Sequence, residues 1–117
     1  MHKKTIEHKL RKLKQELFDI GIPIPGSIQI VYRRCGKKNC WCQQSGSKGH
    51  GPYYIWYKRE QRKLKTQLIS AEDIQIYQEW IKNREAMEVL VKKIVELGAL
   101  YAVDFNNTKI NSKKVHR

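Results

Sequence analysis

Acidic residues are scarce in this sequence and nearly absent from its middle. Of the 117 residues, 24 are Lys or Arg and 11 are Asp or Glu, which gives a net charge of +13. Glu60 is the only acid between residues 20 and 71. A magnesium-dependent nuclease holds its metal with several carboxylates, and a phosphate-binding glycine loop leads into a helix, whereas residues 49–51 lead into a predicted strand. We therefore predict that the protein is not an enzyme.

Long hydrophobic runs are also missing. No stretch of eighteen apolar residues occurs, and the N-terminus is charged where a signal peptide would be apolar. These absences predict a protein of the cytoplasm with no membrane partner, in a compartment where thiols stay reduced. The length suits one domain. Because only 40% of the residues are hydrophobic, a bound metal ion would help to stabilise its middle part.

Cysteine is absent everywhere except in one loop. That loop has the pattern Cys35-x4-Cys40-x-Cys42-x7-His50 and is rich in Gly and Lys. Three thiolates and an imidazole form a complete tetrahedral ligand set, and thiolate-rich sets of this kind select zinc. The pattern therefore predicts a structural Zn²⁺ site with Cys35, Cys40, Cys42 and His50 as ligands.

Other readings of the same four residues stay open. A bridge between Cys35 and Cys42 would leave Cys40 as an unpaired thiol, because three cysteines cannot all form disulfides. Buried inert cysteines are common, although this polar loop offers little apolar surface to cover them. His50 precedes Gly51 and Pro52, so it could instead bond loop carbonyls.

Positive charge is concentrated around the cysteine loop. Residues 31–65 contain ten Lys or Arg and one acid, whereas residues 71–97 contain four Lys or Arg and six acids. A basic patch of this kind raises the local concentration of polyanions and indicates nucleic acid, either DNA or RNA, as the partner. The alternative is a charged surface that only keeps the protein in solution.

The pattern of apolar residues predicts an α+β fold. An N-terminal helix is expected over residues 3–20, because its apolar residues recur three and four positions apart. A three-stranded antiparallel sheet is expected over residues 27–69, with strands near 27–34, 53–59 and 62–69 and the zinc-bound loop between the first two. These elements and the next helix would form one domain, residues 1–98.

A long C-terminal helix is predicted over residues 71–97. Ser70 is a good N-cap, and Gly98 is well placed to end the helix. The helix has an imperfect heptad pattern, which suits a homodimer or a larger protein partner. Residues 99–117 are expected to form a flexible basic tail.

A set of basic and aromatic side chains is predicted to bind the nucleic acid. Base stacking on aromatic rings and phosphate contacts from Lys and Arg are the usual interactions with single strands. Tyr54, Trp56 and Lys58 would share one face of the sheet, although core packing is an alternative fate for these aromatic residues. The full set is Arg33, Arg34, Lys37, Lys38, Trp41, Lys48, Tyr54, Trp56, Lys58, Arg59, Arg62, Lys63 and Lys65.

The string RCGKKNCWC, followed by HGPYY, two strands and a long helix, resembles a family of small uncharacterised prokaryotic and viral proteins. The resemblance covers roughly residues 26–97 and leaves the N-terminal helix outside. It implies a zinc-binding unit made of the three cysteines and His50, and an association with mobile elements. The alternative to direct nucleic-acid binding is a protein-interaction module, in which the long helix docks onto a DNA-processing enzyme as its accessory subunit and the zinc is purely structural.

Overall fold

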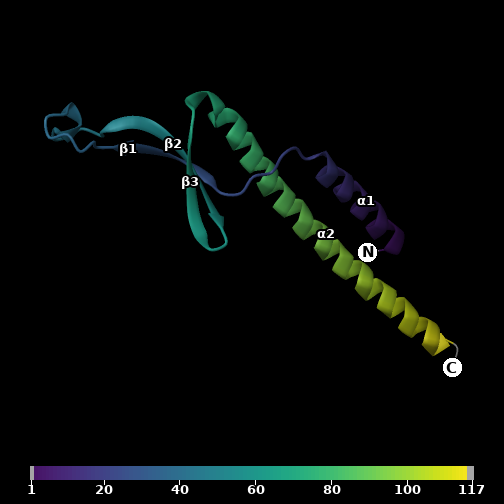
Figure 1. Cartoon of the computed structure of the whole chain (residues 1–117). Coiled ribbons are helices and arrows are strands. Elements are labelled where there is room, and N and C mark those ends of the chain that lie inside the picture. The colour runs from purple at the N-terminus through teal and green to yellow at the C-terminus, as the bar shows by residue number, and fades with distance from the viewer. Residues whose placement is uncertain (1, 116–117) are drawn as a thin grey trace. The chain divides into compact units, whose positions relative to one another are not determined.

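A computed structural model describes residues 2–115 of the chain (Figure 1). The elements in chain order are α1 (Lys3–Asp19), β1 (Ser27–Arg33), η1 (Trp41–Gln43), β2 (His50–Glu60), β3 (Lys63–Ile69), η2 (Ala71–Asp73) and α2 (Ile74–Val115). This is the predicted α+β arrangement of a first helix, an antiparallel sheet and a long last helix. The chain forms two compact units: one contains the chain up to Pro23 and from Asn83 onward, and the other is Ile24–Lys82.

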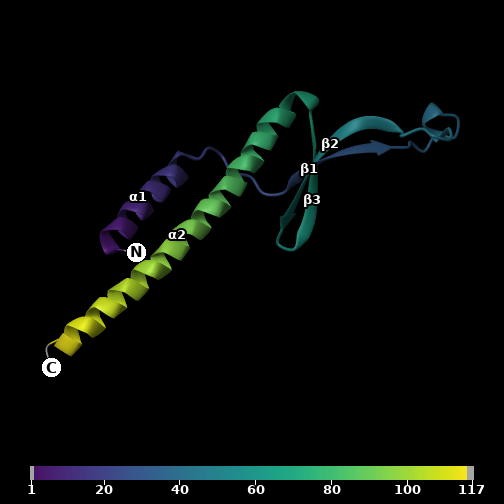
Figure 2. The same cartoon turned by 180° about the vertical axis from the view of Figure 1, so that it is seen from behind.

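The unit Ile24–Lys82 is built on a three-stranded antiparallel sheet with β2 in the centre. Figures 1 and 2 show the sheet from opposite sides. Trp56 in β2 lies between Ile28 in β1 and Gln67 in β3, so these three side chains share one face. The register between β1 and β2 shifts after Val31, and pairing resumes with Arg33 opposite His50. The cysteine loop therefore begins and ends at the same end of the sheet.

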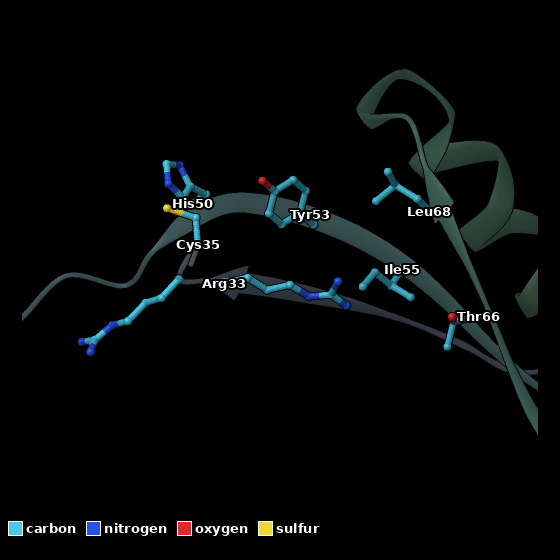
Figure 3. A pocket seen from close by; sticks show the side chains of 8 residues that line it. Arg33, Cys35, His50, Tyr53, Ile55, Thr66 and Leu68 are labelled. Carbon is cyan, nitrogen blue, oxygen red and sulfur yellow. The ribbon is translucent and has the colours of Figure 1, made fainter. Parts of the chain in front are cut away.

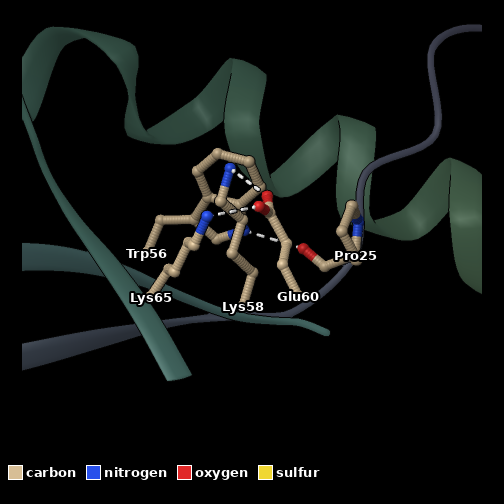
Figure 4. Close-up of polar contacts among 5 residues, drawn as sticks. All are labelled: Pro25, Trp56, Lys58, Glu60 and Lys65. Atoms are coloured by element: carbon tan, nitrogen blue, oxygen red, sulfur yellow. Dashed lines mark hydrogen bonds and ion pairs between the residues drawn. The ribbon is translucent and has the colours of Figure 1, made fainter. Parts of the chain in front are cut away.

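Trp56 is the central core residue of this unit. It is only 9% exposed, and its indole N–H donates a hydrogen bond of 2.7 Å to the carbonyl of Pro25 (Figure 4). The Tyr77 ring packs edge-on against it with 5.7 Å between ring centroids. Trp56 was predicted to offer its ring for base stacking, with core packing as the alternative. Its ring is covered, so Trp56 is a core residue.

A small ion-pair network lies on the same face. The Lys58 Nζ sits 4.3 Å from the centroid of the Trp56 ring. Glu60 accepts from Lys58 at 3.0 Å and from Lys65 at 2.9 Å, as drawn in Figure 4. These two ammonium groups, Lys65 first, hold the pKa of Glu60 below its usual value. The network therefore compensates part of the positive charge on this face.

The other unit pairs α1 with the C-terminal part of α2, and the two helices lie side by side in both views (Figures 1 and 2). Ile6 of α1 is fully buried, and Leu90 of α2 is also a core residue. The Tyr101 hydroxyl donates a 3.0 Å hydrogen bond to the Glu7 carboxylate. The apolar positions predicted for the first helix face the core, since all of them are buried or half-buried: Ile6, Leu10, Leu13, Leu17 and Ile20.

The predicted end of the last helix is wrong. α2 runs through Gly98 and continues to Val115, so residues 99–115 are helical where a flexible tail was expected, and residues 116–117 lie outside the described part. Gly98 has no positive φ, which means that it takes an ordinary helical conformation instead of ending the helix. The start is also later than predicted, because Ala71–Asp73 form the short 3-10 turn η2.

Gly98 offers a direct test of this continuous helix. A Cβ built at Gly98 meets no atom within 4 Å, and glycine inside a helix is about 0.8–1.0 kcal/mol less favourable than alanine. We expect Gly98→Ala to raise the free energy of unfolding by about 0.5–1 kcal/mol, measured by urea denaturation with circular dichroism at the helical band. A loss of stability would contradict a continuous helix.

Gly26→Ala is the matched control for that substitution. Gly26 has φ +87°, and a Cβ there would lie 2.0 Å from the carbonyl oxygen of Tyr57. The same change of residue should therefore destabilise the protein at Gly26, because both the backbone conformation and the contact forbid a side chain.

Candidate metal centre

The four predicted ligands come together at one end of the sheet. Cys35 follows β1, Cys40 and Cys42 flank the start of η1, and His50 is the first residue of β2. Pairing of His50 with Arg33 across the two strands brings the histidine beside Cys35. The ligand atoms, three Sγ and one imidazole nitrogen, all lie within 4.8 Å of one another. The four residues can therefore hold a metal ion, as the sequence predicted.

The distances inside the cluster fit a tetrahedral metal. The Sγ atoms of Cys35 and Cys42 are 3.5 Å apart, and the Cys40 Sγ lies 3.2 Å from His50 Nε2. Ligands about 2.3 Å from a tetrahedral zinc are separated by about 3.8 Å. All three cysteines are free thiols, so the Cys35–Cys42 bridge considered from the sequence is not formed. The distances between the ligand atoms would need to change only slightly to accommodate an ion.

The cluster is partly covered, and its thiols differ in acidity. Cys42 is fully buried, whereas Cys35 is half-buried. Burial raises the pKa of the Cys42 thiol. Hydrogen bonds from the backbone N–H of Lys37 and from the His50 side chain lower the pKa of Cys35 to about 6. Cys35 is thus ready to act as a thiolate at neutral pH, while Cys42 would release its proton when metal binds.

Hydrogen bonds within the loop shape it around the cluster. The Gln43 side-chain amide donates to the Cys35 carbonyl, and the Arg34 guanidinium donates to the Ser47 carbonyl at 3.3 Å. The Ser47 hydroxyl accepts from the Gly49 N–H at 3.1 Å. Gly49 has φ +94°, and a Cβ there would lie 2.6 Å from the Arg33 carbonyl. Glycine at this position allows the chain to pass close to β1 and return to His50.

Trp41 is the exposed aromatic residue of the loop. Its side chain is 56% exposed, and its ring meets the His50 imidazole edge-on with centroids 4.8 Å apart. It therefore holds a proposed ligand on one side and presents a free surface on the other. The predicted basic side chains of the loop are exposed as well: Arg33, Arg34, Lys37, Lys38 and Lys48.

The sheet residues of the predicted site are divided between its two faces. Tyr54, Trp56 and Lys58 share a face, as expected from their alternation, and Lys63 and Lys65 lie on it opposite Glu60 and Lys58. Because the Trp56 ring is covered, this face offers no continuous aromatic platform. Arg59 pairs with Leu64 on the opposite face, and Arg62 lies in the turn between β2 and β3.

A hollow on that opposite face was missed from the sequence. It has a volume of about 330 Å³, and Tyr53, Ile55 and Leu68 line it (Figure 3). Arg33, Arg34, Cys35 and His50 belong to its wall, so the hollow borders the metal cluster. β2 is apolar on both faces, and this pattern could not tell which face would stay open. Leu68 was the available signal, since an apolar residue on a Lys-rich strand needs a neighbour.

Comparison with known proteins places the chain in a family. The model of a domain of unknown function (DUF6788) matches residues 3–79, which include α1, the sheet and all four cluster residues. The chain therefore belongs to this family. The match corrects the resemblance drawn from the sequence, because it includes the N-terminal helix and stops within α2. No curated protein and no solved structure matches the chain.

Proposed function

We propose that this member of the DUF6788 family binds one structural zinc ion through Cys35, Cys40, Cys42 and His50, and binds nucleic acid at the surface around it. The proposal rests on one observation: a four-ligand cluster lies in a loop whose charged side chains are all basic. Three thiolates and an imidazole favour zinc over harder cations. Four protein ligands fill a tetrahedral shell and leave no position for a substrate, so the proposed zinc is not catalytic.

The charge of the loop supports a polyanionic partner. Residues 33–49 carry five Lys or Arg and no acid, and within residues 2–115 none of these five takes part in an ion pair. Glu60, the only acid between residues 20 and 71, lies at the other end of β2 and is already paired with Lys58 and Lys65. The loop therefore keeps its full positive charge for phosphate groups, which dominate the affinity of most nucleic-acid-binding proteins.

Trp41 adds a stacking surface to this charge. A base stacked on an aromatic side chain contributes about 1–3 kcal/mol, and the contact tolerates any base sequence. The ring is exposed beside the metal cluster, where a bound zinc would hold the loop and its ring in place. Contacts from Lys37, Lys38 and Lys48 would then position phosphates near the stacked base.

Substitutions in the loop test the proposal. We expect Lys37→Ala with Lys38→Ala to weaken binding at least tenfold and to reduce the slope of log affinity against log salt by about 0.7–0.9 per lost contact. Both side chains are exposed, so the fold should persist. The measurement is fluorescence anisotropy with a labelled oligonucleotide over a salt series.

Arg11→Ala with Lys14→Ala on α1 is the matched control. It removes the same charge from two exposed helical positions, so it should weaken binding only slightly. Equal losses in the two double variants would show that net charge alone attracts the polyanion, and would count against a binding site in the loop.

A protein partner on α2 is the second candidate. Val95 and Val103 are 65% and 58% exposed on this helix, which leaves apolar surface available for a homodimer or for a DNA-processing enzyme that the chain would serve as an accessory subunit. Light scattering separates the two functions. A monomer that binds an oligonucleotide supports the first, and a stable dimer that binds none supports the second.

A further inference from the structure

The hollow beside the metal cluster gives the proposed function a more specific ligand. Resting on that function, we infer that the hollow receives one unstacked base of a single-stranded nucleic acid, and that the neighbouring arginines contact the adjacent phosphates. Its volume of about 330 Å³ lies at the lower end of the ~300–1,000 Å³ range of small-molecule sites. A hollow of this size suits a single planar group better than a peptide or a helix.

The lining has the chemistry of a base site. Ile55 is 5% exposed and Leu68 is 67% exposed, and the two are opposite each other in β2 and β3. They give the hollow an apolar floor and an open apolar wall. Tyr53, 37% exposed, adds an aromatic ring, and Figure 3 shows the Arg33 side chain extended along the hollow toward Ile55. Aromatic and guanidinium planes are the surfaces on which unstacked bases pack.

The charges at the hollow favour a strand that carries phosphates. No acidic residue lines it, whereas Arg33 and Arg34 do. One Arg34 nitrogen donates to the Ser47 carbonyl, which fixes the side chain and leaves other guanidinium N–H groups free to donate. A neutral aromatic ligand could stack on a guanidinium, but it has no negative charge to pair with these two cations. A nucleotide strand would gain binding energy from both parts of the site: its base from the apolar and aromatic lining, and its phosphates from the two arginines.

The shape favours single strands over duplex. A base inside a duplex is covered on both faces by its neighbours and can enter a hollow only after unstacking, which costs a few kcal/mol. A base in a flexible single strand is already available. The same hollow should therefore distinguish the two forms, although both present the same phosphate charge to the loop.

Two leucines on β3 provide the test. Leu68 and Leu64 point to the same face of the strand, and both are largely exposed, at 67% and 55%. Leu68 lines the hollow beside the metal cluster, and Leu64 lies outside it. Leu68→Asp and Leu64→Asp change the net charge equally, so any difference between them reports on the hollow itself.

Affinities are measured by anisotropy at one salt concentration. The probes are a 15-nucleotide thymidine strand, the matching uridine strand, a 15-base-pair duplex, and a 15-unit abasic strand that keeps every phosphate. The wild-type protein should prefer the thymidine or uridine strand over the duplex at least tenfold. Leu68→Asp should weaken single-strand binding about tenfold more than Leu64→Asp, and this difference should disappear with the abasic strand and the duplex. The thymidine and uridine strands differ in the 2′-hydroxyl and in the base methyl group, and comparing them shows whether the protein prefers DNA or RNA.

Tyr53 provides a second variant that does not alter charge. Tyr53→Phe keeps the ring and should bind the thymidine strand as the wild type does, whereas Tyr53→Ala should bind it about tenfold more weakly. Equal affinities of the two leucine variants for the thymidine strand, together with normal binding by Tyr53→Ala, would overturn the base site while leaving the proposed function intact. Failure of the wild-type protein to bind any of the four probes would instead overturn the proposed function.

Discussion

Replacing Cys42 with serine is expected to abolish stoichiometric metal binding, whereas the wild-type protein should carry about one zinc ion per chain. Cys42 is fully buried, and its Sγ lies 3.5 Å from that of Cys35, so no outside ligand can readily replace it. A serine hydroxyl does not supply the soft anionic sulfur that zinc prefers. Elemental analysis of protein purified without chelator measures both contents.

His50→Ala is a milder substitution in the same site, and its zinc affinity can be compared with that of Cys42→Ser. It leaves three thiolates in place, and a water molecule can reach the vacant position because His50 is only half-buried. We expect it to lower zinc affinity less than Cys42→Ser does, because thiolates dominate such sites. Wild-type protein without metal, or a Cys42→Ser variant with a full complement, would contradict the metal centre.

Loss of the metal should also loosen the loop. Structural zinc contributes about 10–16 kcal/mol of apparent binding energy in zinc-finger peptides. The backbone hydrogen bonds that remain here are local, such as those from Cys40 N–H to the Lys37 carbonyl at 3.3 Å and from Gln43 N–H to the Cys40 carbonyl at 3.1 Å. The amides of residues 35–49 should therefore exchange with solvent much faster in Cys42→Ser, while those of α1 stay protected.

The cluster could be predicted from the sequence because its information is local. All four ligands lie within sixteen residues, and a short loop has few ways to keep them apart. The strands were predictable for a similar reason, since their alternation survives in the register of β2 with β3. The sequence of β2 and its neighbours does not determine which face of this strand is covered. That depends on Tyr77 and Pro25, which come from distant segments and close over Trp56.

The end of α2, in contrast, could not be predicted from the local sequence. Gly98 is a reasonable stop signal in the sequence, but a glycine can also adopt the helical conformation at a cost of only about 1 kcal/mol. Tyr101, one turn later, bonds to Glu7 of α1, and packing of this kind outweighs such a cost. Contacts between helices far apart in the sequence therefore decided a boundary that propensity predicted wrongly.

Trp56→Ala is expected to lower the free energy of unfolding by about 3–5 kcal/mol. The substitution empties the centre of the sheet unit, removes the ring contact with Tyr77, and leaves the Pro25 carbonyl without its 2.7 Å hydrogen bond. Trp56→Phe keeps an aromatic ring and loses the hydrogen bond, which is typically worth about 1 kcal/mol. Hydrogen exchange of the β2 amides measures the loss within this unit directly.

Trp41→Ala should have the opposite effects, with little change in stability and a clear loss of oligonucleotide affinity. Its ring is 56% exposed, and surface substitutions usually change stability by less than about 0.5 kcal/mol. Removing the ring should nevertheless weaken oligonucleotide binding about 5- to 150-fold, because stacking contributes about 1–3 kcal/mol per base. The salt dependence should hardly change, since a ring releases few counterions. If Trp41→Ala proved as destabilising as Trp56→Ala while affinity stayed unchanged, Trp41 would be a structural support for His50, and the stacking surface would have to lie elsewhere.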